Sequence, residues 1–232
     1  MLDKLKQAVC EANLELLNQG LVIQTFGNAS GIDAGREHVV IKPSGVPYEG
    51  MTPDQMVVVS LETGEVVEGE LNPSSDTPTH LELYRAFDAI GGVVHTHSIY
   101  ATAWAQARKE VPCLGTTHAD YFHGPIPCTR VLTPDETEEN YEATTGSVIV
   151  EHFAKIDPLD FPGALVAGHG PFAWGKTPAG AVKTAVIMEY LARLASETLI
   201  VDAESVPLPK HLLDRHFLRK HGPDATYGQK DD

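Results

Sequence analysis

Short β-rich runs divided by turn residues fill the front of the chain and constrain its fold more than any other feature. The runs are LVIQTF (21–26), HVVIK (38–42) and MVVVS (56–60), and GNAS, PSG and MTPDQ separate them. The turn residues at 62–65 then predict a hairpin into Val66-Val67. A β-rich front of this kind favours a partly antiparallel sheet over strict alternation of strands and helices.

The rest of the chain predicts helices and two further strands. Apolar residues that step by three and four predict an N-terminal helix that ends at Gly20. Thr77 and Pro78 predict the N-cap and first turn of another helix. The remaining predicted elements are a buried strand in GGVVHTHS, a helix near 98–107, an irregular stretch through 111–130, a helix near 134–154, a strand at 164–168, and helices at 178–200 and 209–220. No repeat or long linker divides the sequence, so residues 1–232 are predicted to form a single layered α/β domain.

The chain is strongly acidic, and this limits its partners. Its 232 residues carry 17 Lys and Arg against 32 Asp and Glu, a net charge of −15. Such a surface repels nucleic acid and anionic membranes, and an anionic small substrate needs local donors. Cys10, Cys113 and Cys128 form no CxxC pair, which indicates neither a disulfide framework nor a cysteine zinc site and favours a reducing cytoplasm. The charged N-terminus contains no apolar stretch fit for a signal peptide or a membrane span.

Two histidines at the end of a buried strand are candidates for metal ligands. In His95-Thr96-His97 the alternation of strand side chains places both imidazoles on one side, with Cα atoms about 6–7 Å apart. One packed and one exposed histidine is the alternative for an isolated pair, but His169 also follows an apolar strand, between two glycines. Three imidazoles with a carboxylate or an open position are typical of a catalytic zinc-type site. Asp76 is the candidate carboxylate, and helix capping is its alternative role.

Three pairs of small residues mark breaks between the predicted elements. Backbone N–H groups and hydroxyls at such breaks can hold a phosphate or a polyol, although most turns of this composition bind nothing. The pairs are Gly27-Asn28, Ser44-Gly45 and Ser74-Ser75. Lys42 is a candidate for the positive charge that an anionic substrate needs, and a solvated strand end is its alternative.

Two further side chains are candidates for acid–base chemistry. Asp120 lies in GTTHADYFHG, an irregular segment where a carboxylate can transfer protons or only cap a loop. Tyr227 stands in the polar tail, where a tyrosine is ordinarily unordered but can exchange a proton if it is held in place. The residue types alone leave both alternatives open.

Nine segments, taken in order, resemble one known family from end to end. They are GNAS, IKPSGV, VEGELNPSSDTPTHLELY, GGVVHTHS, GTTHADYF, IPCTR, HGPFAWGK, LRKHG and YGQ. Any one of them is a weak signal, but the ordered set at similar spacing is specific. The sequence therefore resembles the class II aldolase/epimerase family.

This resemblance implies a fold, an assembly and a set of site residues. The fold is a three-layer α/β/α arrangement with a central, largely antiparallel or mixed sheet, and the assembly is a homotetramer with active sites between subunits. One divalent cation per chain is implied; imidazole ligands favour Zn²⁺, and Mn²⁺ or Co²⁺ fit the same geometry. The implied metal positions are His95, His97, His169 and, as a ligand or close partner, Asp76. The implied positions for the substrate and its phosphate are Gly27, Asn28, Ser44, Gly45, Ser74 and Ser75. Asp120 is implied to carry out one proton transfer. Tyr227 is implied to carry out the other, in a tail (221–232) that reaches the neighbouring subunit.

The implied activity is metal-dependent epimerisation at C4 of a ketopentose 5-phosphate, through cleavage and re-formation of the C3–C4 bond. A class II aldolase that acts on a sugar phosphate such as fuculose 1-phosphate is the alternative. A non-catalytic interaction domain of the same fold is a further alternative, against which the three histidines argue. Aldolases of the family typically have Glu where this chain has Asp76, and they lack the TTHADYF and YGQ context, which favours the epimerase. The sequence departs from the family at Gly168 and in its last residues, 230–232.

Overall fold

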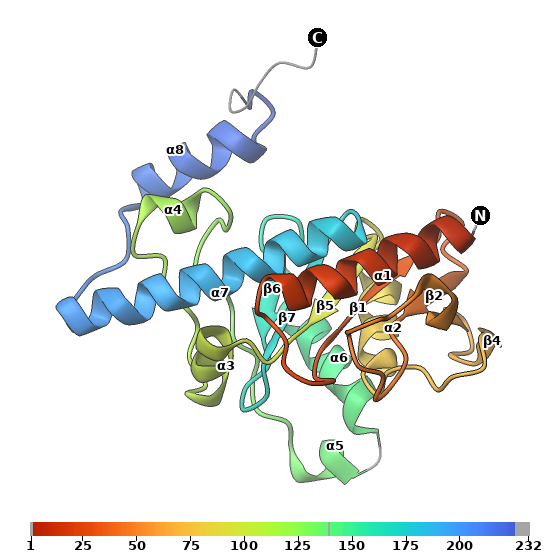
Figure 1. The fold of residues 1–232 in the computed structure, drawn as a ribbon. Coiled ribbons are helices and arrows are strands. Elements are labelled where there is room, and N and C mark those ends of the chain that lie inside the picture. The colour runs from red at the N-terminus through yellow and green to blue at the C-terminus, as the bar shows by residue number, and fades with distance from the viewer. Residues whose placement is uncertain (1, 139, 226–232) are drawn as a thin grey trace.

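The computed structural model describes residues 2–138 and 140–225. Within these residues, seven strands form one sheet in the order β4-β3-β2-β1-β5-β7-β6, and every neighbouring pair is antiparallel (Figure 1). The strands are β1 (Asn28–Ile32), β2 (His38–Ile41), β3 (Val57–Ser60), β4 (Val66–Glu68), β5 (Gly92–His95), β6 (Gly163–Leu165) and β7 (Pro171–Gly175). The helices are α1 (Leu2–Asn18), the 3-10 helix η1 (Pro53–Gln55), α2 (Thr77–Ala86), α3 (Ile99–Gln106), α4 (Thr116–Ala119), α5 (Pro134–Glu138), α6 (Tyr141–His152), α7 (Pro178–Val201) and α8 (Lys210–His221).

Side chains that alternate along the central strands build the two cores of the fold. Val94 of β5 and Ala173 of β7 face a core that α1, α3 and α7 cover. Their neighbours Val93 and Trp174 face the opposite side, where α2 and α6 pack. Helices therefore cover both faces of the sheet, and the predicted α/β class with a largely antiparallel sheet is confirmed.

The prediction of a strand at 21–26 is wrong. The chain bends there, with Gln24 at a φ of 55°, and Ile23 and Phe26 are 63% and 54% exposed. The strand lies at Asn28–Ile32 instead, in the middle of the sheet between β2 and β5, and all its residues are buried. Its sequence, NASGI, consists mostly of small and polar residues, so no hydrophobic pattern predicts that this strand is buried. The strands predicted at 38–42 and 56–60 and the hairpin into β4 are confirmed.

A second difference concerns the segment that contains β6, β7 and the turn between them. The strand predicted at 164–168 is only Gly163–Leu165, and the chain then turns through Gly168, whose φ is 79°, into β7. The sequence does not predict β7, because Pro171 and two glycines surround its short apolar core. The helix predicted near 134–154 is divided into α5 and α6.

The last helix lies apart from the sheet. α8 packs on the short helix α4, and the two form one end of the molecule in Figure 1. Phe217 is the one buried residue of α8. Across the described residues, no helix is both long and apolar enough to cross a membrane.

Candidate active site

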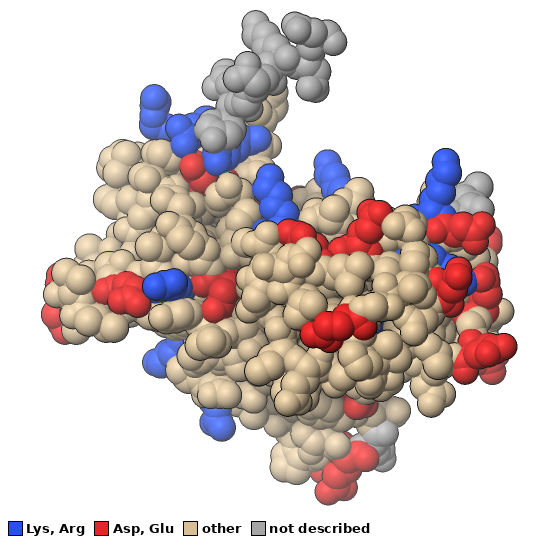
Figure 2. All heavy atoms as spheres, viewed as in Figure 1, with Lys and Arg blue, Asp and Glu red and all other residues tan. Residues whose placement is uncertain are grey.

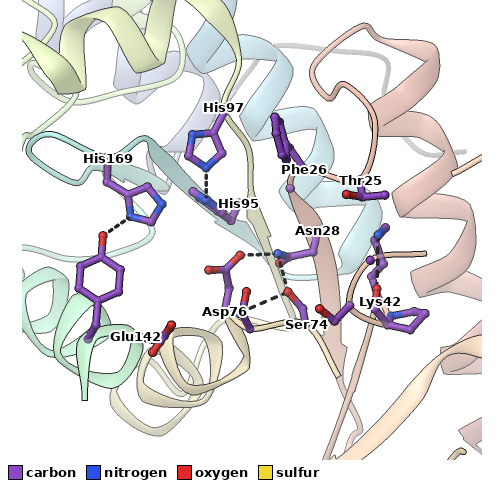
Figure 3. Close-up of a pocket in the computed structure, with 16 residues that line it drawn as sticks. Thr25, Phe26, Asn28, Lys42, Ser74, Asp76, His95, His97, Glu142 and His169 are labelled. Carbon is purple, nitrogen blue, oxygen red and sulfur yellow. Dashed lines mark hydrogen bonds between the residues drawn. The ribbon is translucent and has the colours of Figure 1, made fainter. Parts of the chain in front are cut away.

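A pocket of about 420 Å³ opens where β1 begins and β5 ends, beside the first turns of α2 and α6 (Figure 3). Antiparallel pairing sets Asn28, the first residue of β1, directly opposite His95, the last residue of β5. Every metal and substrate position that the sequence predicted lines this pocket. The lining residues are Thr25, Phe26, Gly27, Asn28, Lys42, Pro43, Ser44, Gly45, Ser74, Ser75, Asp76, His95, His97, Tyr141, Glu142 and His169.

Three histidines converge in the pocket from two adjoining segments. His95 is buried at the end of β5, His97 is exposed just beyond it, and His169 lies half-buried in the turn between β6 and β7. The Nε2 atoms of His95 and His97 are 3.1 Å apart, and one ring nitrogen from each of the three rings falls within 4.8 Å of the others. This group could hold a metal ion.

The protein keeps these imidazoles in the neutral form that a cation requires. The Nδ1 atom of His95 lies 3.0 Å from the carbonyl oxygen of Pro171, so Nδ1 donates and Nε2 retains its lone pair. Burial lowers the pKa of His95 to about 3, although nearby Asp76 opposes the shift. Burial also lowers the pKa values of His97 and His169. Neutral, converging nitrogens beside a carboxylate fit a divalent cation of the zinc type.

Asp76 occupies the N-cap position of α2 but does not cap it. Its side chain makes no cap hydrogen bond, and instead Oδ2 accepts a 2.7 Å bond from the Asn28 amide. Burial opposes ionisation of this carboxyl, but the neighbouring His95 and His80 and the Asn28 amide lower its pKa overall. The sequence left capping and metal ligation open for Asp76. The structure removes the capping role and leaves an ionised carboxylate in the pocket.

The small-residue pairs line the pocket from Asn28, directly opposite His95, to the end at which Lys42 lies (Figure 3). Gly27 and Gly45 have φ values of 77° and 67°, and a Cβ at Gly27 would lie 2.9 Å from the His95 carbonyl oxygen. Lys42 lines the same end but is 1% exposed, and its Nζ donates to the Val46 carbonyl at 2.8 Å. Burial lowers the pKa of Lys42 to about 8. The lining here therefore combines serine hydroxyls with one buried amine.

The sequence missed five residues that line the pocket, one of which is Pro43 beside Lys42. Thr25 and Phe26 lie in the segment wrongly predicted to be a strand, and the Phe26 ring meets His97 edge-on at 6.3 Å between centroids. Tyr141 and Glu142 begin α6, which the sequence placed inside a longer helix. The break between α5 and α6 brings them to the pocket. Asn140 before Tyr141 was the one local signal for that helix start.

Asp120, a predicted acid–base residue, does not line the pocket of its own chain. It follows α4, and its carboxylate is bound by side chains of α8: His216 Nδ1 at 3.1 Å, Arg219 Nη2 at 2.9 Å and Lys220 Nζ at 3.2 Å. The sequence could not predict this, because the partners lie about one hundred residues further along the chain. Tyr227 lies outside the described residues.

Comparison with known proteins assigns the family. Residues 7–196 match the Class II Aldolase and Adducin N-terminal domain family. The chain belongs to this family, and the prediction of family membership is confirmed.

Two relatives match over the full length. Two proteins named L-ribulose-5-phosphate 4-epimerase UlaF, from Salmonella paratyphi B (strain ATCC BAA-1250 / SPB7) and Salmonella paratyphi A (strain ATCC 9150 / SARB42), are 55% identical over 229 residues. The alignments cover 99% of this chain and 100% of each relative. Among solved structures, an L-fuculose 1-phosphate aldolase superposes with a TM-score of 0.77 at 25% identity, covering 92% of this chain and 94% of that one.

Proposed function

We propose that this protein is a metal-dependent L-ribulose-5-phosphate 4-epimerase, an isomerase that forms D-xylulose 5-phosphate. The observation that carries the proposal is the pocket, which is lined by three converging histidines, Asp76, the small-residue pairs and Lys42. The full-length identity of 55% to relatives that bear this name agrees with it, as does the prediction from the sequence. The reducing cytoplasm is the compartment that its cysteines favour.

The reaction requires cleavage of a carbon–carbon bond. The C4 hydrogen of a 2-ketopentose is not next to the C2 carbonyl and is barely acidic, so direct removal of this proton is unfavourable. The C4 hydroxyl is β to the carbonyl, and its deprotonation breaks C3–C4 to give an enediolate and glycolaldehyde phosphate. Rotation of the aldehyde and re-addition at C3 then inverts C4, with the proton returned to the C4 oxygen.

One divalent cation per chain would be held by His95, His97 and His169, with Asp76 as a fourth ligand or close partner. When bound, it supplies Lewis-acid stabilisation of the negative charge that develops on the C2 and C3 oxygens. Imidazole ligation favours zinc, and manganese or cobalt suit the same donors. Asn28 orients Asp76 through the 2.7 Å bond to its carboxylate.

The opposite end of the pocket would hold the phosphate while the aldehyde fragment rotates. Ser44, Ser74 and Ser75 would supply hydroxyls there, and Gly27 and Gly45 keep the lining free of bulk. Lys42 adds the positive charge that a net charge of −15 otherwise denies an anionic substrate. An anchored fragment rotates without escaping, which keeps re-addition intramolecular.

Two acid–base groups are needed because the C4 oxygen lies on opposite sides before and after rotation. We assign these roles to Asp120 and Tyr227. Asp120 does not line the pocket of its own chain, so both residues are proposed to come from an adjoining subunit of a homotetramer. The fold supports this assignment, since α8, which leads to the tail that carries Tyr227, packs against the residues around Asp120.

An isotope experiment tests the proposed reaction. In deuterated water, the purified protein with divalent metal should convert L-ribulose 5-phosphate to product without deuterium at C4, because the C4–H bond stays intact. Nuclear magnetic resonance of the product measures this. Deuterium at C4 would contradict the mechanism, and stoichiometric release of free aldehyde would favour the aldolase alternative that the solved neighbour suggests.

A further inference from the structure

Two buried or half-buried histidines of the pocket are held in different ways. His95 belongs to a strand, and the Pro171 carbonyl accepts from its Nδ1 at 3.0 Å. His169 stands in a turn between Gly168 and Gly170, so neither neighbouring side chain restrains its ring. Its Nδ1 lies 3.3 Å from the hydroxyl oxygen of Tyr141, and the two rings are tilted by 33°.

Tyr141 itself is anchored by the elements that carry the rest of the site. It is the first residue of α6, and the Thr145 hydroxyl donates to its carbonyl at 2.8 Å. The next carbonyl, that of Glu142, accepts from the Thr79 hydroxyl of α2 at 2.5 Å. A Cβ at Gly146 would lie 2.6 Å from Glu82 of α2, so the two helices pack too closely to slide. The helix that begins beside Asp76 therefore also fixes where Tyr141 lies.

We propose that Tyr141 is a positioning residue for the metal site: its hydroxyl oxygen accepts the Nδ1 proton of His169 and leaves Nε2 unprotonated for the cation. The inference rests on the proposed function, because it presumes that the pocket binds a divalent metal. Ligating histidines ordinarily donate their second ring N–H to a fixed acceptor, and loss of such an acceptor weakens metal binding by about 10–100-fold. For His95 the acceptor is backbone, whereas for His169 it is a side chain that substitution can remove.

The test measures zinc affinity directly rather than turnover. Wild-type protein, Tyr141→Phe and the control Tyr190→Phe are titrated with Zn²⁺ against a chromophoric chelator. Tyr190 is 55% exposed on α7 and does not line the pocket, so its substitution removes a hydroxyl without touching the site. We expect Tyr141→Phe to bind Zn²⁺ about 10–100-fold more weakly and Tyr190→Phe to match the wild type.

A double-mutant cycle shows whether Tyr141 acts through His169. In a His169→Asn background, Tyr141→Phe should weaken zinc binding no further. An equal loss in both backgrounds, or a Tyr141→Phe affinity equal to that of the wild type, would overturn the inference and leave the proposed function standing. Wild-type protein that binds no Zn²⁺, Mn²⁺ or Co²⁺ would overturn the proposed function itself. Because phenylalanine keeps the ring of a residue that is 37% exposed, the thermal melting curve checks that the variant is folded.

Discussion

The histidine pocket and the corner formed by α4 and α8 both contain a carboxylate among histidines, yet they differ in what holds that carboxylate. Asp76 in the pocket accepts from the neutral Asn28 amide. Asp120 at the corner is bound by Arg219 and Lys220 as well as His216, and lysine and arginine side chains gather over this end of the molecule (Figure 2). Asp76 thus has a neutral hydrogen-bond partner, whereas Asp120 forms ion pairs with cationic side chains of its own chain.

The difference shows which parts of the site one chain can build. A zinc-type site can use neutral imidazole nitrogens and a carboxylate, and the pocket has both where β1 begins and β5 ends. Ion pairs and hydrogen bonds lower the pKa of Asp120, although burial opposes them, so this carboxylate is a weak base in its present setting. We therefore expect the pocket to bind the metal and the substrate, and proton transfer to depend on the corner of an adjoining chain.

The largest effect is expected from removing a pocket histidine. His97→Asn should lower metal content and turnover together, by about 1,000-fold in turnover, because Lewis-acid stabilisation worth roughly 4 kcal/mol is lost. Metal analysis and an epimerase assay measure the two quantities. Chelation of the wild type should have the same result and be reversed by zinc or manganese.

His152→Asn is the matched control, since His152 is exposed at the end of α6 and does not line the pocket. It should keep both metal and activity. If His97→Asn keeps a full complement of metal, His97 is not a metal ligand. The pocket would then not differ from the corner by binding a cation through His97.

The second prediction tests whether the two regions meet between chains. Asp120→Asn and His97→Asn should each be nearly inactive alone. After co-refolding, a site that takes its pocket from an Asp120→Asn chain and its carboxylate from a His97→Asn chain is intact. Random mixing supplies each half with a chance of one half, so about a quarter of wild-type activity should return. The assay of the mixed oligomer against unmixed parents measures it.

A second mixture distinguishes the donor chains. Asp120 is bound to α8, which leads to Tyr227, so Asp120→Asn mixed with Tyr227→Phe should recover no activity, because both residues would come from one chain. Recovery near a quarter in this mixture would place Asp120 and Tyr227 in different chains. No recovery in the first mixture would confine the site to one chain.

The pocket was more predictable than the corner for a physical reason. His95 ends a strand and His97 lies two residues further on, so the period of two predicted that both face one side, and their Nε2 atoms lie 3.1 Å apart. Antiparallel pairing then adds Asn28 beside His95. By contrast, Asp120 depends on partners about one hundred residues away, which no local pattern encodes.

The strands likewise differ in whether the local sequence or their place in the sheet explains them. Strands with β-branched residues, such as Val57–Ser60, were predicted, whereas Asn28–Ile32 was not, because its burial comes from its central place in the sheet. The second core is similar: Trp174 in β7 packs against α2 and α6, but Pro171 and the glycines around it suggest a turn. Tertiary position overrides local propensity in these two strands.

The smallest expected effect concerns the Lys42 side chain of the pocket, as distinct from Arg219 and Lys220 of the corner. Lys42 has a pKa lowered to about 8 by burial, so it is charged below that pH and neutral above it. The substrate phosphate, with a second pKa of about 6, is already a dianion at pH 7. If Lys42 binds it, kcat/KM should fall as pH rises through 8, because kcat/KM reports groups of the free enzyme.

Lys42→Met decides whether that fall comes from Lys42. This variant should have a KM raised about tenfold at pH 7, the loss of roughly 1.4 kcal/mol of binding, and the fall through pH 8 should disappear. The value of kcat at saturating substrate should change little, because the phosphate lies away from the bond that breaks. A wild-type profile that stays level from pH 7 to 9.5 would show that Lys42 does not supply the charge that binds the phosphate. A fall that persists in Lys42→Met would come from another titrating group.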